Sequence, residues 1–321
     1  MFAALLESLR PRQWTKNFLV FGALFFVPGA ILMPQLILRA VLAFFLFSFA
    51  AGAGYLINDI KDREYDRSHP RKRSRPIASG RLGIAAAIAA AIVLILVVLA
   101  GGLWLDLTDV RLPESATHLD GMMYPFLVTV GGYLVLVFVY TLWFRNVALL
   151  DVLFLSVGFT LRAVAGAVAL KVIISPWLLL CTGLLALYLA LGKRRQELVR
   201  LASVQPAVDA AGGNSARPAL SGYSVPLLDQ LLIIAASVNL MSYSLYTFSG
   251  SGHHDNRLML TIPFVVYGIF RYHSLIHNHD AGEAPDEVLL GDWPLIICII
   301  LWAVFVTILF LWPGFQQPLE G

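Results

Sequence analysis

Residues 84–103 read IAAAIAAAIVLILVVLAGGL, and residues 295–311 read LIICIILWAVFVTILFL. Neither stretch holds a charged side chain, and each approaches the roughly 20 residues that an α-helix needs to cross a bilayer. Transmembrane β-strands would instead alternate apolar and polar residues over short segments. Since lipid accepts only helices or a closed barrel, both stretches predict membrane-spanning α-helices.

The composition of the whole chain agrees with this prediction. Of 321 residues, 59% are hydrophobic and 13% are charged, and the mean hydropathy is +0.77. Soluble domains average roughly 45–50% apolar and about 25% charged residues. The chain therefore has too few charges to cover a water-exposed surface, which excludes a soluble enzyme and a disordered or fibrous protein. Cys181 and Cys298 lie in apolar segments and give no disulfide framework or thiolate metal site.

We therefore predict an all-α, polytopic membrane protein that forms a single domain over residues 1–321. Nine apolar segments qualify as spans: Phe18–Leu32, Leu36–Leu56, Ile84–Leu103, Met122–Trp143, Leu150–Leu170, Ser175–Leu191, Leu227–Phe248, Leu258–Ile276 and Trp293–Leu311. The first is the weakest, because Pro28 and Gly29 interrupt it. The residues before it carry no cleavage signal, so we expect this segment to be retained.

The basic residues predict the orientation in the membrane. Of the 23 Lys and Arg, 17 lie before the first span or in connections that follow even-numbered spans. The positive-inside rule then places the N-terminus and these connections in the cytoplasm, and the C-terminus outside.

Polar residues gather at the cytoplasmic end of the second span, where residues 54–77 read GYLINDIKDREYDRSHPRKRSRPI. On a helix, Asn58, Asp62 and Asp66 form one stripe with four-residue spacing, and Asp59 lies beside it. Carboxylate and amide oxygens of this kind suit Mg²⁺, with Mn²⁺ as the alternative ion. Clustered carboxylates at a membrane surface repel one another unless a cation compensates, so the stripe predicts a metal site.

Basic side chains accompany the stripe: Arg63, Arg71, Arg73 and Arg75. Cations next to carboxylates are what a Mg-diphosphate needs, since they bind the phosphate oxygens that the metal leaves open. Polybasic loops also commonly contact anionic lipid headgroups. The basic residues alone leave both interpretations open.

The pattern Asn58-Asp59-x-x-Asp62-x-x-x-Asp66 resembles the first aspartate-rich motif of the UbiA superfamily of intramembrane prenyltransferases. The resemblance implies nine transmembrane helices around a central cavity that opens to the cytoplasmic side, with the motif at the cytoplasmic end of helix two. The predicted span count, orientation and motif position agree with it over nearly the whole chain.

A second aspartate-rich motif is usual in this superfamily at the cytoplasmic end of helix six. Here residues 192–198 read GKRRQEL, so three cations and one carboxylate stand in its place. This departure is similar to the decaprenyl-phosphate phosphoribosyltransferase branch, which residues 9–17 (LRPRQWTKN), 140–145, 150–152, 158–162 and 267–272 also resemble. Arg145 stands where that branch commonly has Lys, which keeps the charge and changes the donor geometry.

That branch implies transfer of 5-phosphoribose from phosphoribosyl diphosphate to a long polyprenyl (decaprenyl) phosphate. Diphosphate is released, and the product is a precursor of a cell-wall arabinose donor. The two substrates carry three anionic groups, so a site that binds them needs many cations and few carboxylates. Lys193 and Arg194, in place of aspartates, agree with this requirement. The implied location is a bacterial inner membrane.

The resemblance also implies an active site on the cytoplasmic connections 57–83 and 192–226. Catalytic candidates are Asp59, Asp62 and Asp66, and the candidate metal ligands are Asn58, Asp62 and Asp66. Candidates for substrate binding are Lys16, Asn17, Arg63, Arg71, Arg73, Arg75, Tyr140, Arg145, Asp151, Arg162, Lys193, Arg194 and Glu197. Arg162 falls deep inside a span, where it either serves the lipid phosphate or pairs with a carboxylate.

Two other functions stay open. A UbiA-type prenyltransferase would join a prenyl diphosphate to an aromatic or other acceptor, and residues 193–197 argue against it. A transporter would carry its functional polar residues near mid-membrane, whereas here they cluster at the cytoplasmic end.

The expected partners are the two substrates and the bilayer, without nucleic acid, and a homo-oligomer is compatible with the sequence. Tyr223, Tyr243 and Tyr246 are expected to pack or line a cavity.

Overall fold

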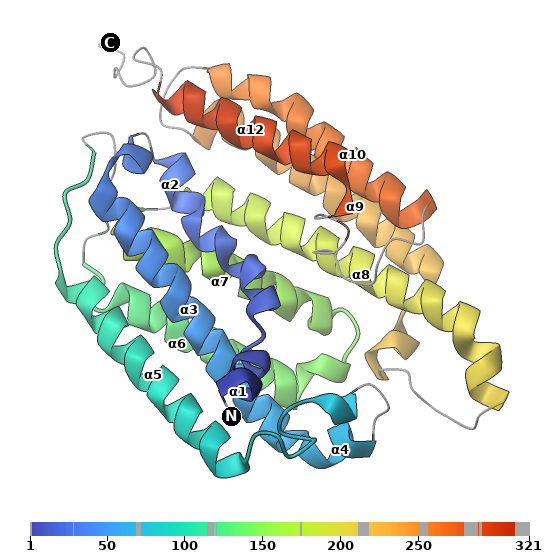
Figure 1. The fold of residues 1–321 in the computed structure, drawn as a ribbon. Helices are drawn as coiled ribbons and strands as arrows, with labels where there is room; N and C mark the ends of the chain where they lie inside the picture. Colours follow the sequence, from blue (N-terminus) through green and yellow to red (C-terminus); the bar gives the residue numbers. More distant parts are fainter. Residues whose placement is uncertain are drawn as a thin grey trace, which may run out of the picture. The chain divides into compact units, whose positions relative to one another are not determined.

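The computed structural model is helical throughout its regular structure (Figure 1). It describes residues 2–27, 29–68, 72–113, 119, 121–173, 175–210, 218–250, 256–278, 288 and 291–311, and these contain no β-strand. Eight helices within these residues are long and apolar enough to cross a membrane. The predicted all-α class is therefore confirmed.

The eight long helices coincide with the second to ninth predicted spans. They are α3 Pro34–Lys61, α5 Ile84–Leu107, α6 Pro125–Leu142, α7 Leu150–Ala169, α8 Pro176–Ala210, α9 Val225–Leu245, α10 Ile262–Asn278 and α12 Trp293–Leu311. A π-helical turn, η6 (Tyr246–Gly250), extends α9, and a 3₁₀ helix, η7 (Asn256–Thr261), precedes α10.

The segment predicted as the first span is not one helix. It is divided among a 3₁₀ helix η1 (Pro11–Phe21), a short α2 (Gly22–Phe26) and a second 3₁₀ helix η2 (Ala30–Leu32). Gly29 lies between them with φ of 78°, a left-handed conformation that ends a helix. The described residues therefore give eight candidate spans where the sequence predicted nine.

Helix α8 is longer than the sequence suggested. Residues 192–226 were predicted as a cytoplasmic connection, yet α8 runs without interruption to Ala210. Most residues from Lys193 to Leu201 are good helix formers, so the helix continues after the apolar stretch ends. The candidate residues of this segment thus lie on a helix, while residues 211–217 fall outside the described part.

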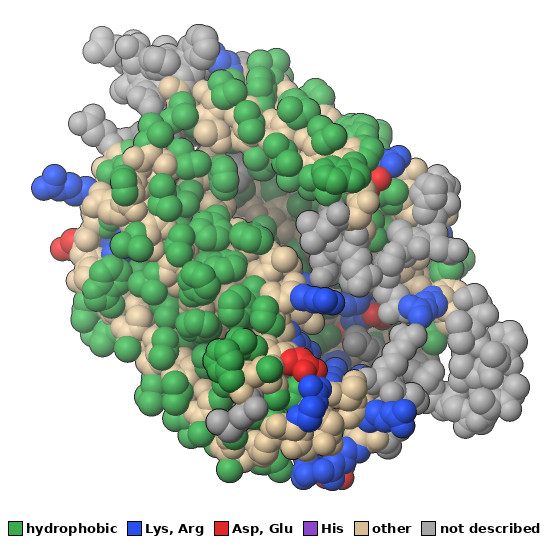
Figure 2. All heavy atoms as spheres, in the orientation of Figure 1, with side chains coloured by type: hydrophobic (Ala, Val, Ile, Leu, Met, Phe, Trp, Pro, Cys, Tyr) green, Lys and Arg blue, Asp and Glu red, His purple; other side chains and the backbone are tan. Residues whose placement is uncertain are grey.

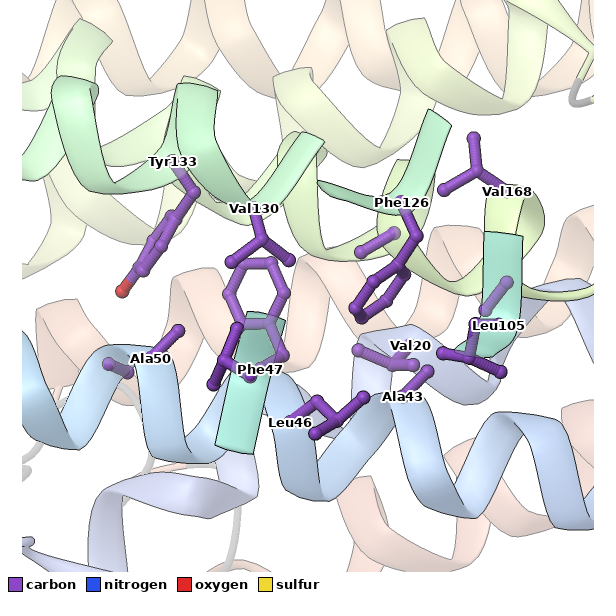
Figure 3. Close-up of a cluster of buried hydrophobic side chains, with 14 residues drawn as sticks. Val20, Ala43, Leu46, Phe47, Ala50, Leu105, Phe126, Val130, Tyr133 and Val168 are labelled. Atoms are coloured by element: carbon purple, nitrogen blue, oxygen red, sulfur yellow. The ribbon is translucent and has the colours of Figure 1, made fainter. Parts of the chain in front are cut away.

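Contacts divide the chain into two compact units. Unit 1 comprises residues 1–24, 30–141 and 161–173, and unit 2 comprises residues 25–29, 142–160 and 174–321. In unit 1, α5 and η1 both pack along α3 (Figure 1). Its core gathers Phe47, Phe126, Val130 and Tyr133 around α3 and α6, and the Phe47 and Tyr133 rings lie 4.5 Å apart (Figure 3).

One glycine in unit 1 permits a very close helix contact. A Cβ atom added to Gly166 of α7 would lie 1.9 Å from the backbone oxygen of Val20 in η1. Only glycine leaves room for this approach. The N-terminal 3₁₀ helix is thereby seated directly on the α7 backbone.

Unit 2 is built on α8 and α9, which pack side by side, and on the pair α10 and α12. Its core includes Tyr188, Leu228, Leu232 and Tyr272. Asp292 accepts the Leu295 N–H at the start of α12 and two hydrogen bonds from Arg271 of α10. Asp292 therefore caps the N-terminus of α12 and also pairs with the charge of Arg271.

The outer surface of α5 is apolar as well as exposed. Ile92, Val93 and Leu96 each expose more than half of their area. Figure 2 shows hydrophobic side chains over much of the face in view, while Lys and Arg gather toward the end where α4 (Arg63–Ser68) lies in Figure 1. So large an apolar surface fits contact with lipid, and the protein is a multi-pass membrane protein.

A buried arginine joins helix ends in unit 1. Arg39 of α3 donates to the Ala169 carbonyl at the end of α7 (2.7 Å), and to the Leu105 and Thr108 carbonyls at the end of α5. These carbonyls have no partner within their own helices. Arg39 is 3% exposed, so the three contacts satisfy polar groups that water does not reach freely.

We expect Arg39→Met to lower the free energy of unfolding by about 3 kcal/mol, because each buried carbonyl left without a donor costs about 1–3 kcal/mol. The measurement is thermal denaturation of the purified protein in detergent. Arg111→Met is the matched control, since Arg111 is exposed after the end of α5. Equal melting temperatures for both variants would contradict the capping role.

Candidate active site

The predicted Asn58, Asp62 and Asp66 stripe lies where α3 meets α4. Helix α3 ends at Lys61, and Asp62 (φ −84°, ψ 5°) separates it from α4. The Asp62 N–H still donates to the Asn58 carbonyl and the Asp66 N–H to the Asp62 carbonyl, both at 2.8 Å. Helical hydrogen bonds therefore connect the three positions across the break, and they lie on successive turns.

Two aspartates of the motif are buried and held by arginines. Oδ1 of Asp59 accepts hydrogen bonds from Arg10 (2.6 Å) and Arg75 (3.1 Å). Nη1 of Arg75 also donates to Oδ2 of Asp66 at 2.7 Å. Asp59 and Asp66 are 3% and 1% exposed. The result is an alternating chain of four charges, Arg10–Asp59–Arg75–Asp66, which we call the motif ion chain.

Arg10 reaches this chain from the N-terminal segment. It adopts a left-handed backbone (φ 52°) between α1 (Phe2–Ser8) and η1, next to Pro11. Its guanidinium also lies over the Tyr55 ring at 4.8 Å. The turn at Arg10 thus directs a cation from the start of the chain onto Asp59.

The loop that carries Arg75 is fixed by packing. Arg75 follows a 3₁₀ turn, η3 (Lys72–Ser74), and the next apolar residues, Ile77 and Leu82, are buried in a cluster with Leu56 of α3. Arg67 donates to the Ala78 carbonyl at 3.0 Å. The loop is therefore anchored beside the motif, and Arg75 is held within reach of both aspartates.

A second contact ties this loop to α1. Arg81 forms two hydrogen bonds with the Glu7 carboxylate, at 2.8 and 2.9 Å. The hydrogen bond from Arg81 holds the pKa of Glu7 below its ordinary value, so this pair stays charged at neutral pH. Both side chains are about half exposed, which makes the contact a modest contribution to stability.

The motif fits a divalent cation that also binds substrate, although it does not form a complete protein cage. Among the described residues no three His, Cys, Asp or Glu side chains converge as a metal site. The expected convergence of carboxylates is absent from this part of the chain, because Asp59 and Asp66 turn to Arg10 and Arg75. Oδ1 of Asp66, however, is buried and accepts no hydrogen bond from a described residue. Mg²⁺ commonly takes one or two carboxylates together with phosphate and water, so this oxygen suits it.

Asn17 and Arg162, both predicted to bind substrate, contact each other in the interior of unit 1. Nε of Arg162 donates to Oδ1 of Asn17 at 2.8 Å, and Nη2 donates to the Tyr133 hydroxyl at 3.1 Å. Asn17 in turn donates to Oγ of Ser48 at 2.9 Å. This buried network connects η1, α3, α6 and α7, which gives both residues a role in holding the helices together.

A second ion cluster lies in unit 2, around the predicted Asp151 and Arg194. Nε of Arg194 donates to Oδ2 of Asp151 and Nη1 to Glu197, each at 2.6 Å. The Tyr223 hydroxyl donates to Oδ1 of Asp151, also at 2.6 Å. Asp151 is fully buried and Arg194 is 1% exposed. Three residues predicted for substrate binding are therefore brought together, in a buried ion cluster.

The chain matches the UbiA prenyltransferase family over residues 17–291. It belongs to this family. It is 33% identical over 308 residues to the decaprenyl-phosphate phosphoribosyltransferase of Corynebacterium glutamicum, covering 94% of this chain and 85% of that one. Its identity to the enzyme of that name from Mycobacterium tuberculosis is 32% over 310 residues, covering 95% and 94%.

Solved structures of UbiA homologues share the fold. A homologue from Archaeoglobus fulgidus bound to GPP and Mg²⁺ superposes with a TM-score of 0.63 at 17% identity, covering 96% of this chain and 99% of that one. The same homologue bound to Cd²⁺ gives a TM-score of 0.61 at 16% identity, covering 96% and 99%. At such identities the likeness shows the fold alone.

The other predicted residues of this UbiA family member are more dispersed. Those that are half-buried are Lys16 in η1, Tyr140 on α6, Arg145 in the 3₁₀ turn η4 (Phe144–Asn146) and Lys193 on α8. Arg73 is exposed on η3, and Arg63 lies 3.6 Å from Glu64. Arg71 lies outside the described residues.

Sequence reasoning gave no site role to Arg10 or Tyr133, and it expected Tyr223 only to pack or line a cavity. Arg10 belongs to the stretch 9–17 that resembles the phosphoribosyltransferase branch, so a signal for it was present. The two tyrosines reach their partners across long sequence separations, and no local pattern marks them.

Replacing Arg75 should make the motif dependent on divalent cations. We expect Arg75→Met to lower the free energy of unfolding by about 2 kcal/mol, because two buried carboxylates lose a shared cation that is itself partly exposed. Added Mg²⁺ should raise the melting temperature of Arg75→Met more than that of the wild type, since Arg75 and a cation neutralise charge on the same carboxylate, Asp66. Arg73→Met, two residues away and exposed, is the control. A wild-type melting temperature and Mg²⁺ response in Arg75→Met would contradict the motif ion chain.

Proposed function

We propose that this UbiA family member transfers 5-phosphoribose from phosphoribosyl diphosphate to a polyprenyl phosphate. The products are polyprenylphosphoryl-5-phosphoribose and diphosphate. The observation that carries the proposal is in the middle of α8, where Lys193, Arg194 and Arg195 stand in place of a second aspartate motif. The relatives named decaprenyl-phosphate phosphoribosyltransferase, at 32–33% identity over most of the chain, support it.

The charges of the substrates fit this arrangement. Phosphoribosyl diphosphate carries a diphosphate and a 5-phosphate, and the acceptor lipid carries another phosphate. The described part of the chain offers the half-buried Lys16, Arg145 and Lys193, besides Arg10 and Arg75 of the motif ion chain. Cations of this kind bind phosphate through short, charge-assisted hydrogen bonds.

The proposed reaction needs little acid–base chemistry. The bond from ribose C1 to the diphosphate breaks, and its electron pair leaves with the diphosphate. An oxygen of the lipid phosphate forms the new bond to C1, which has oxocarbenium character in the transition state. That oxygen is already an anion, so no strong general base is required. Catalysis is then mainly positioning and electrostatic stabilisation.

Asn58, Asp62 and Asp66 are the residues that would hold Mg²⁺ or Mn²⁺. The chemistry that such an ion supplies is neutralisation of charge on the departing diphosphate. Asp59 is buried and accepts hydrogen bonds from Arg10 and Arg75, so its role is to orient these two cations. A cation bound to Asp66 would weaken the hold of this carboxylate on Arg75, and the Arg75 guanidinium would then be available to phosphate.

In unit 2 we assign different roles to the residues that were predicted to bind substrate. Arg194 binds Asp151 and Glu197, so it fixes this part of α8 against α7 rather than contacting the donor directly. Lys193 and Arg145 are half-buried and are the candidates for phosphate contacts there. Asn17 and Arg162 act by holding η1 against α7.

The membrane setting follows from the charge distribution. We place the protein in a bacterial inner membrane, with the N-terminus in the cytoplasm and the C-terminus outside. The soluble donor would then meet the motif from the cytoplasm, at the mouth of a central cavity. The lipid product would serve cell-wall biogenesis as a precursor of an arabinose donor.

The second candidate function is prenyl transfer from a prenyl diphosphate. It is favoured by the shared fold of the Archaeoglobus fulgidus homologue bound to GPP and Mg²⁺, and by the retained first aspartate motif. The cations at residues 193–195 weigh against it. A transporter would carry its functional polar residues near mid-membrane, whereas the motif ion chain lies at the junction of α3 and α4.

An assay with purified protein, Mg²⁺, decaprenyl phosphate and labelled phosphoribosyl diphosphate tests the proposal. The expected result is a lipid product whose mass exceeds that of decaprenyl phosphate by one phosphoribosyl group. Asp66→Asn should lower turnover about a hundredfold or more, because a metal-ligand charge is lost. Glu64→Gln, on the exposed face of the same short helix, should remain near wild type.

Product only in a parallel reaction with a labelled prenyl diphosphate would favour the second candidate. Normal turnover of Asp66→Asn at low Mg²⁺ would instead remove the metal assignment and leave the transfer reaction standing.

A further inference from the structure

Tyr223 connects two segments that the proposed mechanism leaves unexplained. It follows the 3₁₀ turn η5 (Pro218–Gly222) in the connection between α8 and α9. Its hydroxyl donates to Oδ1 of Asp151 at 2.6 Å and accepts the Leu149 N–H at 2.7 Å. Tyr223 is 7% exposed. Its single buried hydroxyl therefore binds both the turn before α7 and the carboxylate of Asp151 in the first turn of α7.

The turn held by Tyr223 is strained. Leu149 has φ of 67°, a left-handed conformation that a branched aliphatic residue rarely adopts and that costs on the order of 1 kcal/mol. Leu149 is 47% exposed, so it is only partly buried. The hydrogen bond from its N–H to Tyr223 is the contact that favours this conformation.

Gly222 brings the two segments into direct contact. A Cβ atom added to Gly222 would lie 2.6 Å from Cβ of Ala148, far closer than two methyl groups can approach. Among the described residues other than its chain neighbours, no other atom lies within 4 Å of that position. Glycine is therefore required for η5 to rest on the turn that contains Ala148 and Leu149.

The turn carries a residue of the proposed site. Arg145 lies in η4, four residues before Leu149, and Asp151 pairs with Arg194 of α8. Burial and the hydrogen bond to Asp151 raise the pKa of Tyr223 well above its ordinary value, so the hydroxyl keeps its proton and remains a donor. The contacts of Gly222 and Tyr223 thus fix the turn with Arg145 and the Asp151–Arg194 pair in one arrangement.

We propose that Gly222 and Tyr223 form a latch that positions Arg145 to bind a phosphate group of the donor. The latch joins the connection after α8 to the connection before α7. Tyr223 is a positioning residue in this scheme, acting through Arg145 and Asp151. The part that concerns donor binding rests on the proposed function, whereas the latch itself stands on the contacts of Tyr223 and Gly222.

The first test removes only the hydroxyl. Tyr223→Phe should accelerate hydrogen exchange at the Leu149 amide, measured by mass spectrometry on peptides covering residues 144–151. It should also raise the KM for phosphoribosyl diphosphate about tenfold, the scale of one charge-assisted contact, with kcat changed less than twofold. Tyr243→Phe is the matched control, since Tyr243 is a buried tyrosine bonded to Thr261 and Trp302 in the same unit.

The second test uses the close contact. Gly222→Ala should show the same faster exchange and higher KM, because the new Cβ pushes η5 away from the turn. Adding Ala148→Gly removes the atom that it meets, so the double variant should recover wild-type exchange and KM. A merely structural loss would not be rescued by making a second residue smaller.

The outcomes separate the two proposals. Absence of phosphoribosyl transfer by the wild type would overturn the proposed function, and the exchange measurements would still decide on the latch. Unchanged exchange at residues 144–151 in Tyr223→Phe, or no recovery in the double variant, would overturn the latch. Faster exchange with an unchanged KM would overturn its role in donor binding.

Discussion

Buried carboxylates at the end of a membrane helix are the constraint on which the site depends. Taking a carboxylate out of water costs several kcal/mol even after the protein relaxes, unless cations and hydrogen bonds compensate. Asp59 and Asp66 impose this cost at the junction of α3 and α4. Arg10 and Arg75 offset it, and to do so the N-terminal segment and the loop after η3 must both lie against α3. The folding of two connections is thus tied to the chemistry of the motif.

The same constraint has a different outcome in unit 2. Both carboxylate oxygens of Asp151 are occupied, one by Arg194 and the other by Tyr223. Asp66 leaves Oδ1 without a partner in the described part of the chain. A cation that binds phosphate therefore suits the first cluster, while the second is complete without one. This contrast agrees with the presence of an aspartate motif after α3 and its replacement by basic residues at α8.

The sequence predicted the features that local chemistry determines. Long apolar stretches predicted eight of the helices, although α8 runs to Ala210, well past the predicted end of its span at Leu191. The four-residue spacing of Asn58, Asp62 and Asp66 survives as helical hydrogen bonds. The partners of the charged residues were out of reach, since Arg10 and Asp59 or Arg194 and Asp151 are separated by more than 40 positions. The interruption at Gly29 was visible as a weak span, but its division into short helices depends on packing such as that of Val20 on Gly166.

The length of α8 has a consequence for the membrane around it. Its 35 residues extend about 52 Å at 1.5 Å per residue, against a hydrocarbon core of about 30 Å. Roughly two fifths of the helix therefore extends beyond the hydrocarbon core, and its charged residues are carried on a continuous helix that extends on both sides of them. If the bilayer becomes a few ångströms thicker or thinner, its boundary can move along this helix without bending it. The geometry around Arg194 is in this way insulated from changes in lipid chain length.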